Sequence, residues 1–165
     1  MKSISLVTGL VILSLVAHSG IAGGPSSLTW RTFDAGMAEA QRSNKKVLID
    51  VYTDWCGWCK KMDASTYTDK SLTDYLNRHY VVIKMNAERS TTVTYRGREY
   101  SERELAASFG VTGYPATVFL TSSGDPITLY PGYAEAKDFR HVVSYIAEDH
   151  YKTRKFDEYL STVKD

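Results

Sequence analysis

Residues 47–62 of the chain read Val-Leu-Ile-Asp-Val-Tyr-Thr-Asp-Trp-Cys-Gly-Trp-Cys-Lys-Lys-Met. The first six positions form a nearly continuous apolar run, which is typical of a strand buried on both faces of a parallel sheet. The residues after it indicate a loop that enters a helix, with two cysteines at the entry. This stretch therefore predicts a buried strand, a loop and a helix that begins at a pair of thiols.

The spacing of Cys56 and Cys59 has a chemical reason. A thiol at a helix N-terminus meets unpaired backbone N–H groups and the positive end of the helix dipole, which stabilise a thiolate. A second thiol three residues further on lies about one turn along the same face, where it can attack a mixed disulfide formed by the first. A Cys-x-x-Cys pair between a buried strand and a helix thus predicts a thiol–disulfide redox motif.

Two other uses of this cysteine pair are less favoured. A disulfide between cysteines so close in sequence restricts almost no chain entropy, so it stabilises little as a structural cross-link. A zinc site needs four ligands, and the chain has no other cysteine and no histidine near the pair in sequence. We expect no metal and no separate cofactor, because the redox-active group is the Cys56–Cys59 disulfide itself.

The composition limits the class of protein. The chain has 165 residues, of which 43% are hydrophobic and 24% charged, and these values fit one domain with a packed core. Its 20 Lys and Arg and 19 Asp and Glu give a net charge of +1, without the basic surplus of a nucleic-acid binder. With only two cysteines, the chain is not a disulfide-stapled mini-protein.

The N-terminal segment has the pattern of an export signal. Lys2 precedes an apolar run over 4–17, and small residues follow up to Ala22. This pattern predicts a secretory signal peptide over 1–22, cut after Ala22 or at Ser19, and a mature domain over 23–165. The alternative is an uncleaved membrane anchor, but the run is shorter than the roughly 20 residues that span a bilayer. We expect export to an oxidising compartment, where disulfides persist.

The rest of the chain alternates helical and strand patterns. The predicted strands are 47–52, 80–85, 116–120 and 127–130, of which the last two form an antiparallel pair. The predicted helices are 34–43, one opening at the cysteines, one capped by Thr68, one from a capping box at Ser101–Glu104 to Gly110, 136–150, and an amphipathic tail, 152–164. Residues 88–100 are polar and indicate an insertion with a turn at Arg96–Gly97. This order predicts an α/β fold with a mixed sheet.

Two separated motifs carry a family resemblance. Trp55-Cys56-Gly57-Trp58-Cys59-Lys60 follows Asp50-Val51-Tyr52, and Gly113-Tyr114-Pro115-Ala116-Thr117 lies far downstream. Together they resemble the thioredoxin-fold family and, more narrowly, bacterial periplasmic thioredoxin-like proteins and the C-terminal domain of the thiol:disulfide interchange protein DsbD. The resemblance covers about residues 28–150. It implies a thioredoxin fold, α/β with a central mixed sheet flanked by helices, to which the tail adds an extra C-terminal helix.

The resemblance implies a role for four residues in the chemistry. Cys56 matches the family nucleophile and Cys59 the resolving thiol. Asp50 matches a buried acid that assists proton transfer to and from the resolving thiol, and Lys84 matches a lysine that pairs with it. A carboxylate in an apolar strand should have a raised pKa and act as a base near neutral pH. The alternatives are a solvated acid at a strand end and a snorkelling lysine.

The resemblance also implies a substrate surface. Pro115 matches a cis proline that faces the disulfide and exposes backbone groups of Tyr114 to a substrate strand. The alternative is an ordinary trans proline that starts a strand. Trp55, beside the motif, and Gly57 and Trp58, between the cysteines, complete the predicted surface. Trp58 stands where thioredoxins carry proline, and it either docks substrate or lies over the helix end; the reduction potential does not transfer from thioredoxin.

These observations predict an exported thiol:disulfide oxidoreductase that reduces protein disulfides in the periplasm. The resemblance suggests a membrane electron-transfer protein as the electron donor. One alternative is the reverse chemistry, a disulfide-donating oxidase or isomerase. Another is a redox-inactive peptide-binding module in which the cysteines are a permanent staple. We expect a monomer that binds no nucleic acid; the alternative for the tail, 152–164, is a role in dimerisation.

Overall fold

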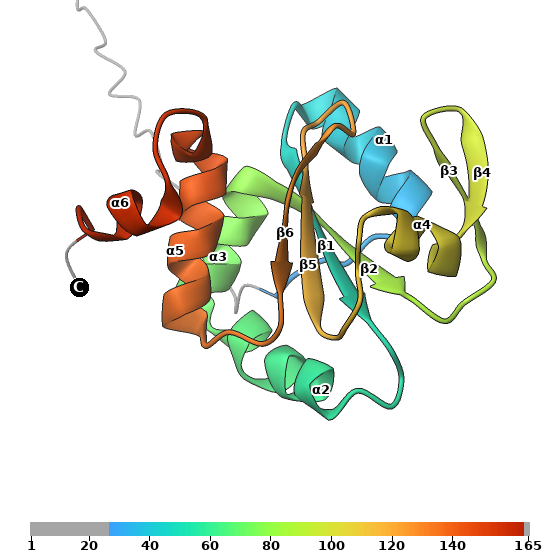
Figure 1. The fold of residues 1–165 in the computed structure, drawn as a ribbon, viewed down its shortest axis with the longest axis horizontal. Coiled ribbons are helices and arrows are strands. Elements are labelled where there is room, and N and C mark those ends of the chain that lie inside the picture. Colours follow the sequence, from blue (N-terminus) through green and yellow to red (C-terminus); the bar gives the residue numbers. More distant parts are fainter. Residues whose placement is uncertain (1–26, 164–165) are drawn as a thin grey trace, which may run out of the picture.

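A four-stranded mixed sheet forms the centre of the molecule (Figure 1). The computed structural model describes residues 27–163, so the predicted signal peptide lies outside the described residues. The strand order is β2-β1-β5-β6, with β1 and β2 parallel, β5 antiparallel to β1, and β6 antiparallel to β5. The strands are β1 (Lys46–Tyr52), β2 (Tyr80–Asn86), β5 (Ala116–Leu120) and β6 (Pro126–Pro131). The predicted mixed sheet is confirmed.

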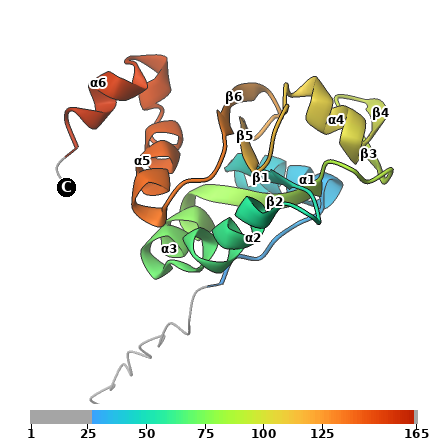
Figure 2. The same cartoon turned by 60° about the horizontal axis from the view of Figure 1, so that its bottom comes forward.

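Helices cover both faces of this sheet. One face packs against α1 (Phe33–Ser43) and α4 (Glu102–Ser108). The other packs against α2 (Gly57–Ala64), the 3-10 turn η1 (Thr66–Thr68), α3 (Lys70–His79) and α5 (Ala136–Ala147). Figure 2 shows α2 and α3 together below the sheet. The predicted α/β class, with a sheet flanked by helices, is confirmed.

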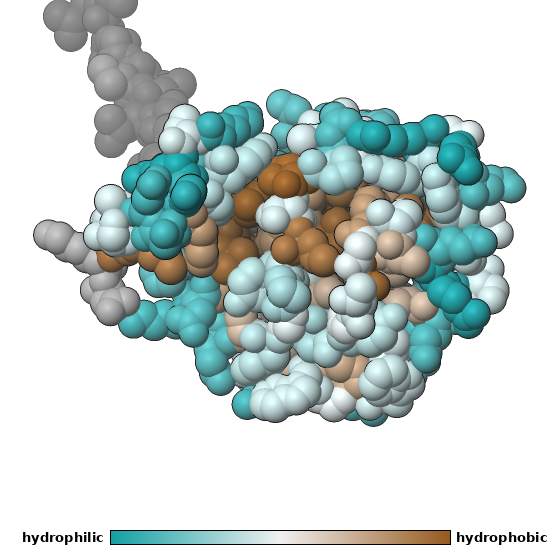
Figure 3. All heavy atoms as spheres, in the orientation of Figure 1, coloured by the Kyte–Doolittle hydropathy of each residue, from teal (hydrophilic) through white to brown (hydrophobic). Residues whose placement is uncertain are grey.

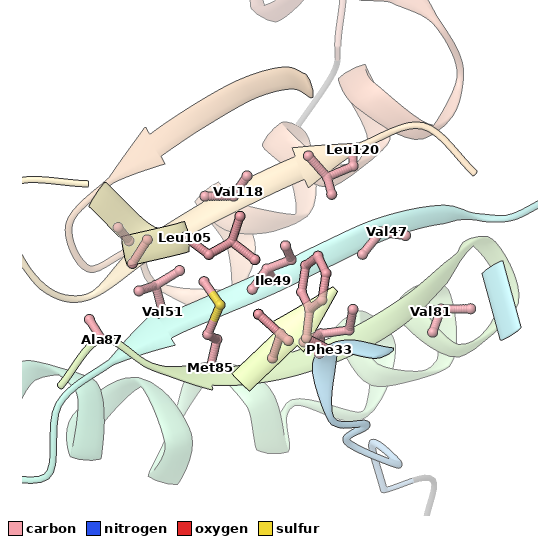
Figure 4. Packing of buried hydrophobic residues seen from close by; sticks show 14 of the residues in the cluster. Phe33, Val47, Ile49, Val51, Val81, Met85, Ala87, Leu105, Val118 and Leu120 are labelled. Carbon is pink, nitrogen blue, oxygen red and sulfur yellow. The ribbon is translucent and has the colours of Figure 1, made fainter. Parts of the chain in front are cut away.

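Strand β1 supplies both halves of the core. Because side chains alternate along a strand, Val47, Ile49 and Val51 face the α1 and α4 layer, and Leu48 faces the other layer. Figure 4 shows Ile49 and Val51 packed with Met85 of β2. Asp50 occupies the remaining central position, so a carboxylate enters the layer beneath α2 and α3.

The insertion predicted at 88–100 contains a β-hairpin. Strand β3 (Thr92–Tyr95) pairs with β4 (Arg98–Ser101) in a separate two-stranded sheet. The turn residues Arg96 and Gly97 have φ angles of 52° and 75°, the left-handed values that a tight hairpin turn requires. The predicted turn is therefore confirmed. Tyr95 packs its ring against Phe33 and Phe109, which joins the hairpin to the core.

Three predicted helix boundaries are wrong. Thr68 ends η1, and Asp69 caps α3 instead, accepting a hydrogen bond from the Leu72 backbone N–H at 2.8 Å. Helix α5 ends at Ala147 and not at residue 150, since Asp149 has a left-handed φ of 61° before the 3-10 turn η2 (His150–Lys152). The tail forms only the five-residue helix α6 (Phe156–Leu160).

The short tail packs back on its own domain. The rings of Phe156 and Tyr159 lie 5.2 and 5.3 Å from the ring of Tyr145 on α5. Leu129 of β6 joins Tyr145 and Phe156 in lining a shallow groove, and Figure 3 shows apolar side chains gathered over β6, between α4 and α5. Phe156 and Tyr159 of the tail therefore extend the core of the same chain, whereas Leu160 is exposed. Over residues 27–163, no helix has the length and apolarity to cross a bilayer.

Substituting Gly36 by alanine tests the packing of α1 on β2. An added Cβ would lie 2.4 Å from Cγ1 of Ile83, whose side chain is fully buried. Overpacking costs about 1–3 kcal/mol, and the better helix propensity of alanine offsets up to about 1 kcal/mol. We expect G36A to lower the free energy of unfolding in urea. The control is G113A, whose Cβ meets nothing within 4 Å; equal stability of the two variants would contradict the close packing.

Candidate redox site

The two cysteines form a disulfide at the beginning of α2. Cys56 is the N-cap of this helix, and its Sγ accepts a hydrogen bond from the backbone N–H of Cys59 at 3.0 Å. Upstream, the N–H of Cys56 donates to the Thr53 carbonyl at 3.2 Å, so a tight turn links the end of β1 to the helix. A thiolate at Cys56 would keep the same donor after reduction. The structure therefore confirms a disulfide at the predicted pair and its place at a helix N-terminus.

Asp50 and Lys84 meet as a buried ion pair. They are partners in the parallel register of β1 and β2, and Nζ of Lys84 lies 2.5 Å from Oδ2 of Asp50. Asp50 is only 2% exposed, and the hydroxyl of Tyr67 donates to its Oδ1 at 3.4 Å. The acid is thus buried and not solvated, and the lysine turns inward to it.

Burial is the largest influence on the pKa of Asp50 and raises it above the ordinary aspartate value. The charge and hydrogen bond of Lys84 oppose this rise, whereas the nearby carboxylate of Asp63 adds to it. Burial lowers the pKa of Lys84, but its two carboxylate partners raise the pKa above its ordinary value overall. The cluster holds two carboxyl groups and one amine, and the raised pKa values of Asp50 and Lys84 both favour the protonated form of these groups.

The peptide bond between Tyr114 and Pro115 is cis. Pro115 is buried directly before β5, and its carbonyl accepts a hydrogen bond from the N–H of Gly132 at 2.8 Å. Both residues line a shallow cavity of about 240 Å³ together with Gly132 and Leu129. That this proline faces the disulfide and exposes the Tyr114 backbone to a substrate stays a prediction.

The two tryptophans of the motif are the most exposed of the large apolar side chains described. Trp55 is 67% exposed; its indole N–H donates to Oε1 of Glu88 at 2.9 Å, and its ring meets Tyr114 edge-on at 6.0 Å. Trp58 is 57% exposed and lies 5.2 Å from the ring of Tyr133. The ammonium of Lys61 lies over both of these last rings, at 4.9 and 4.7 Å. The two indoles thus contact different parts of the chain, Trp55 packing on Tyr114 and Trp58 on Tyr133.

Gly57 between the cysteines is not required by packing. It is the first residue of α2, and an added Cβ would meet nothing within 4 Å. Its predicted place in a substrate surface stays a prediction. Across residues 27–163, His, Cys, Asp and Glu side chains do not gather in groups of three or more that suit a metal ion.

Four residues beside the predicted ones were not found from the sequence: Asp63, Tyr67, Glu88 and Tyr133. Asp63 had a usable signal, because it lies four positions after Cys59 and so falls on the same face of the helix. Glu88 and Tyr133 had none, since they reach the tryptophans from loops far away in sequence. The structure joins Asp50 to Lys84, Cys56 to Cys59 and Trp55 to Tyr114, and it sets Trp58 on Tyr133.

A disulfide at the N-terminus of the helix that follows a central strand is the arrangement of a thioredoxin-like domain. The family model described as a thioredoxin-like domain matches residues 33–147, and the chain belongs to this family.

Individual relatives agree with this assignment. The chain is 31% identical over 97 residues to a thiol:disulfide interchange protein DsbD of Actinobacillus pleuropneumoniae serotype 5b (strain L20), covering 58% of this chain and 15% of that protein. It is 32% identical over 108 residues to a protein disulfide-isomerase of Hordeum vulgare, covering 66% and 18%. A solved thioredoxin-fold protein from Helicobacter pylori has a TM-score of 0.59 at 25% identity, over 72% of this chain and 79% of that one. The chain spans less than a fifth of the two curated relatives.

The buried carboxyl of Asp50 predicts a pH-dependent stability. Because its pKa is raised in the folded state, it contributes stability that is present at low pH and lost as the pH rises through the folded pKa. We therefore expect D50N to gain stability relative to the wild type as the pH increases. Urea unfolding of the oxidised protein over a pH series measures this difference.

The control for this series is D74N, which removes a partly exposed acid that pairs with Lys70 on α3. Its stability relative to the wild type should change less with pH than that of D50N. A difference between D50N and the wild type that stays constant or shrinks as the pH rises would contradict the raised pKa of Asp50.

Proposed function

We propose that this protein is an exported, periplasmic thioredoxin-like reductant of protein disulfides. The observation that carries the proposal is the Cys56–Cys59 disulfide at the N-cap of α2, where the backbone N–H of Cys59 points at the Cys56 sulfur. A helix N-terminus stabilises a thiolate on that sulfur, and a thiolate is the attacking species in disulfide exchange. Membership of the family does not by itself fix the direction of electron flow, toward the substrate, or the compartment, the periplasm.

The proposed reaction transfers two electrons to the substrate. The Cys56 thiolate attacks one sulfur of the substrate disulfide and bonds to it, and the other substrate sulfur leaves as a thiolate that takes up a proton. Cys59 then gives its proton to Asp50, and its thiolate attacks the Cys56 sulfur. This second exchange forms the Cys56–Cys59 disulfide and releases the second substrate thiolate. The substrate is reduced, and the protein is oxidised.

Asp50 suits the role of the proton acceptor for Cys59. Burial raises the pKa of its carboxyl, so it is a stronger base than an exposed aspartate. General-base catalysis is most efficient when the pKa of the base lies near the working pH. Lys84, bound to Oδ2 at 2.5 Å, balances the charge of the carboxylate form.

The proposed substrate surface consists of aromatic side chains near the disulfide and the backbone of Tyr114. Trp55 and Trp58 expose more than half of their surface, and the ring of Trp55 contacts Tyr114, which lines a cavity together with Pro115. A substrate segment in extended conformation would pair with the backbone of Tyr114, as peptides do when they add a strand. Gly57 adds no side chain to this surface, and an added Cβ there would meet nothing within 4 Å.

Three observations support export, a membrane donor and a monomeric state. The N-terminal 22 residues have the pattern of a signal peptide. One relative is a thiol:disulfide interchange protein, which fits a donor that passes electrons by exchanging disulfides with this chain. The tail supports a monomer, since Phe156 and Tyr159 already pack on Tyr145 of the same domain.

The reduction potential separates a reductant from an oxidase or isomerase. Because a reductant needs a low potential, we expect a value toward the about −270 mV of thioredoxin, whereas a value near about −120 mV, as in strong periplasmic oxidants, would reverse the proposed direction. Equilibration with dithiothreitol or glutathione buffers, followed by the fluorescence of the adjacent Trp55 and Trp58, measures the potential. The mid-range value of isomerases, about −180 mV, would also count against a dedicated reductant.

Cysteine variants test the chemistry and the compartment together. We expect C56S to reduce insulin with dithiothreitol no faster than the uncatalysed background, because the nucleophile is missing. C59A should accumulate mixed disulfides through Cys56, and these should appear in the periplasmic fraction of cells that express the full chain. The double variant C56S/C59A is the control and should trap nothing. If C56S is as active as the wild type, the cysteines are a staple and the reductase proposal fails.

A further inference from the structure

The ammonium of Lys84 joins a buried carboxylate to a surface carboxylate. It bonds to Oδ2 of Asp50 at 2.5 Å and also to Oδ1 of Asp63. The side chain of Asp50 is 2% exposed and that of Asp63 is 44% exposed, whereas Lys84 itself is 19% exposed. The three groups come from β1, α2 and β2, and they form a continuous polar path from the interior to the surface.

Three aromatic rings hold the ammonium in this place. The ring centroids of Trp30, Tyr52 and Tyr67 lie 4.8, 5.1 and 5.5 Å from Nζ of Lys84. Each ring attracts a cation over its face, so the rings favour the charged lysine and restrict its position. Tyr67 also donates its hydroxyl to Asp50, at 3.4 Å. These contacts therefore favour a lysine that stays beside Asp50 even if Asp63 is removed.

This path ends in an open cavity that is separate from the predicted substrate surface. The cavity has a volume of about 440 Å³, and Trp30, Asp63, Tyr67 and Lys84 are among its lining residues. Neither cysteine and neither exposed tryptophan lines it. The ion pairs from Asp50 through Lys84 to Asp63 thus lead to a cavity whose lining is separate from the cysteines and the exposed tryptophans.

We propose that Asp63 is a positioning residue for the reaction: it shares Lys84 with Asp50, so that Asp50 remains able to accept the Cys59 proton and pass it to solvent through this cavity. This inference rests on the proposed function. With Asp63 in place, one ammonium serves two carboxylates, and the cluster carries a net negative charge that favours proton uptake. Without it, Lys84 would neutralise Asp50 alone, and Asp50 would be a weaker base.

The direction of the expected change follows from the charges around Asp50. The titratable groups that face it are Lys84 from β2, Asp63 from α2 and Tyr67 from η1, and Tyr52 of β1 faces the lysine. The negative charge of Asp63 raises the pKa of Asp50, so its removal lowers that pKa. Cys59 titrates only in the reduced protein, and the oxidised protein therefore isolates the effect of Asp63.

The decisive experiment is a carbon-13 NMR titration of the Asp50 carboxyl in the oxidised full chain. We expect the titration midpoint of D63N to lie below that of the wild type, and that of D63E to stay near the wild type because the charge is restored. The matched control is D74N, which removes an acid of comparable exposure from a lysine pair on α3. A D63N midpoint that equals or exceeds those of the wild type and D74N would overturn the proposal.

A second measurement connects this charge sharing to the reaction. The acid limb of the pH profile for insulin reduction should move to lower pH in D63N and stay in place in D63E and D74N. An unmoved acid limb in D63N would also overturn the positioning role. The two proposals fail in different ways: a wild type that does not reduce insulin removes the proposed function, whereas the NMR titration of the oxidised protein needs no turnover.

Discussion

The ion pair between Asp50 and Lys84, set in the middle of the sheet, is the constraint on which the site depends. Strand β1 is buried on both faces, so a carboxylate at its centre loses its hydration. This loss is costly unless a cation and hydrogen-bond donors replace the water. The parallel register with β2 supplies Lys84 directly opposite, and η1 supplies the hydroxyl of Tyr67. A shift of one residue in this register would leave the acid unpaired, and the layer of α2 and η1 would lose its polar anchor.

The same strand also places the chemistry. Where β1 ends, a tight turn at Thr53 carries the chain into α2, and Cys56 takes the N-cap position with a backbone N–H at its sulfur. The buried acid and the disulfide therefore occupy one short segment, between the strand and the first turn of the helix. The loop before β5 reaches this segment through the ring contact of Tyr114 with Trp55. Reactive groups are thus local in sequence, while the surface around them is assembled from distant loops.

The sequence predicted the elements that follow a local apolar or turn pattern. It did not predict helix ends where two adjacent residues are both suitable caps or where a helical pattern continues past the helix. Alternating and continuous apolar runs located all four strands of the central sheet, and the turn at Arg96–Gly97 followed from residues that suit a left-handed backbone. The cap of α3 was wrong by one residue, because Thr68 and Asp69 are both good caps and η1 uses the first of them. The tail was predicted too long, because its apolar spacing is compatible with a full helix, although only Phe156–Leu160 forms one.

By itself the sequence determined the central strand and the cysteine pair at a helix entry, since each depends on residues within a few positions of one another, and two separate short motifs gave the resemblance to a redox family. Only the tertiary structure decided that Lys84 is shared by Asp50 and Asp63 inside three aromatic rings. It also decided that Trp55 leans on Tyr114, whereas Trp58 leans on Tyr133. The physical reason is that these contacts join segments far apart in the chain. No periodic pattern in the sequence marks such contacts, so they depend on how the layers pack.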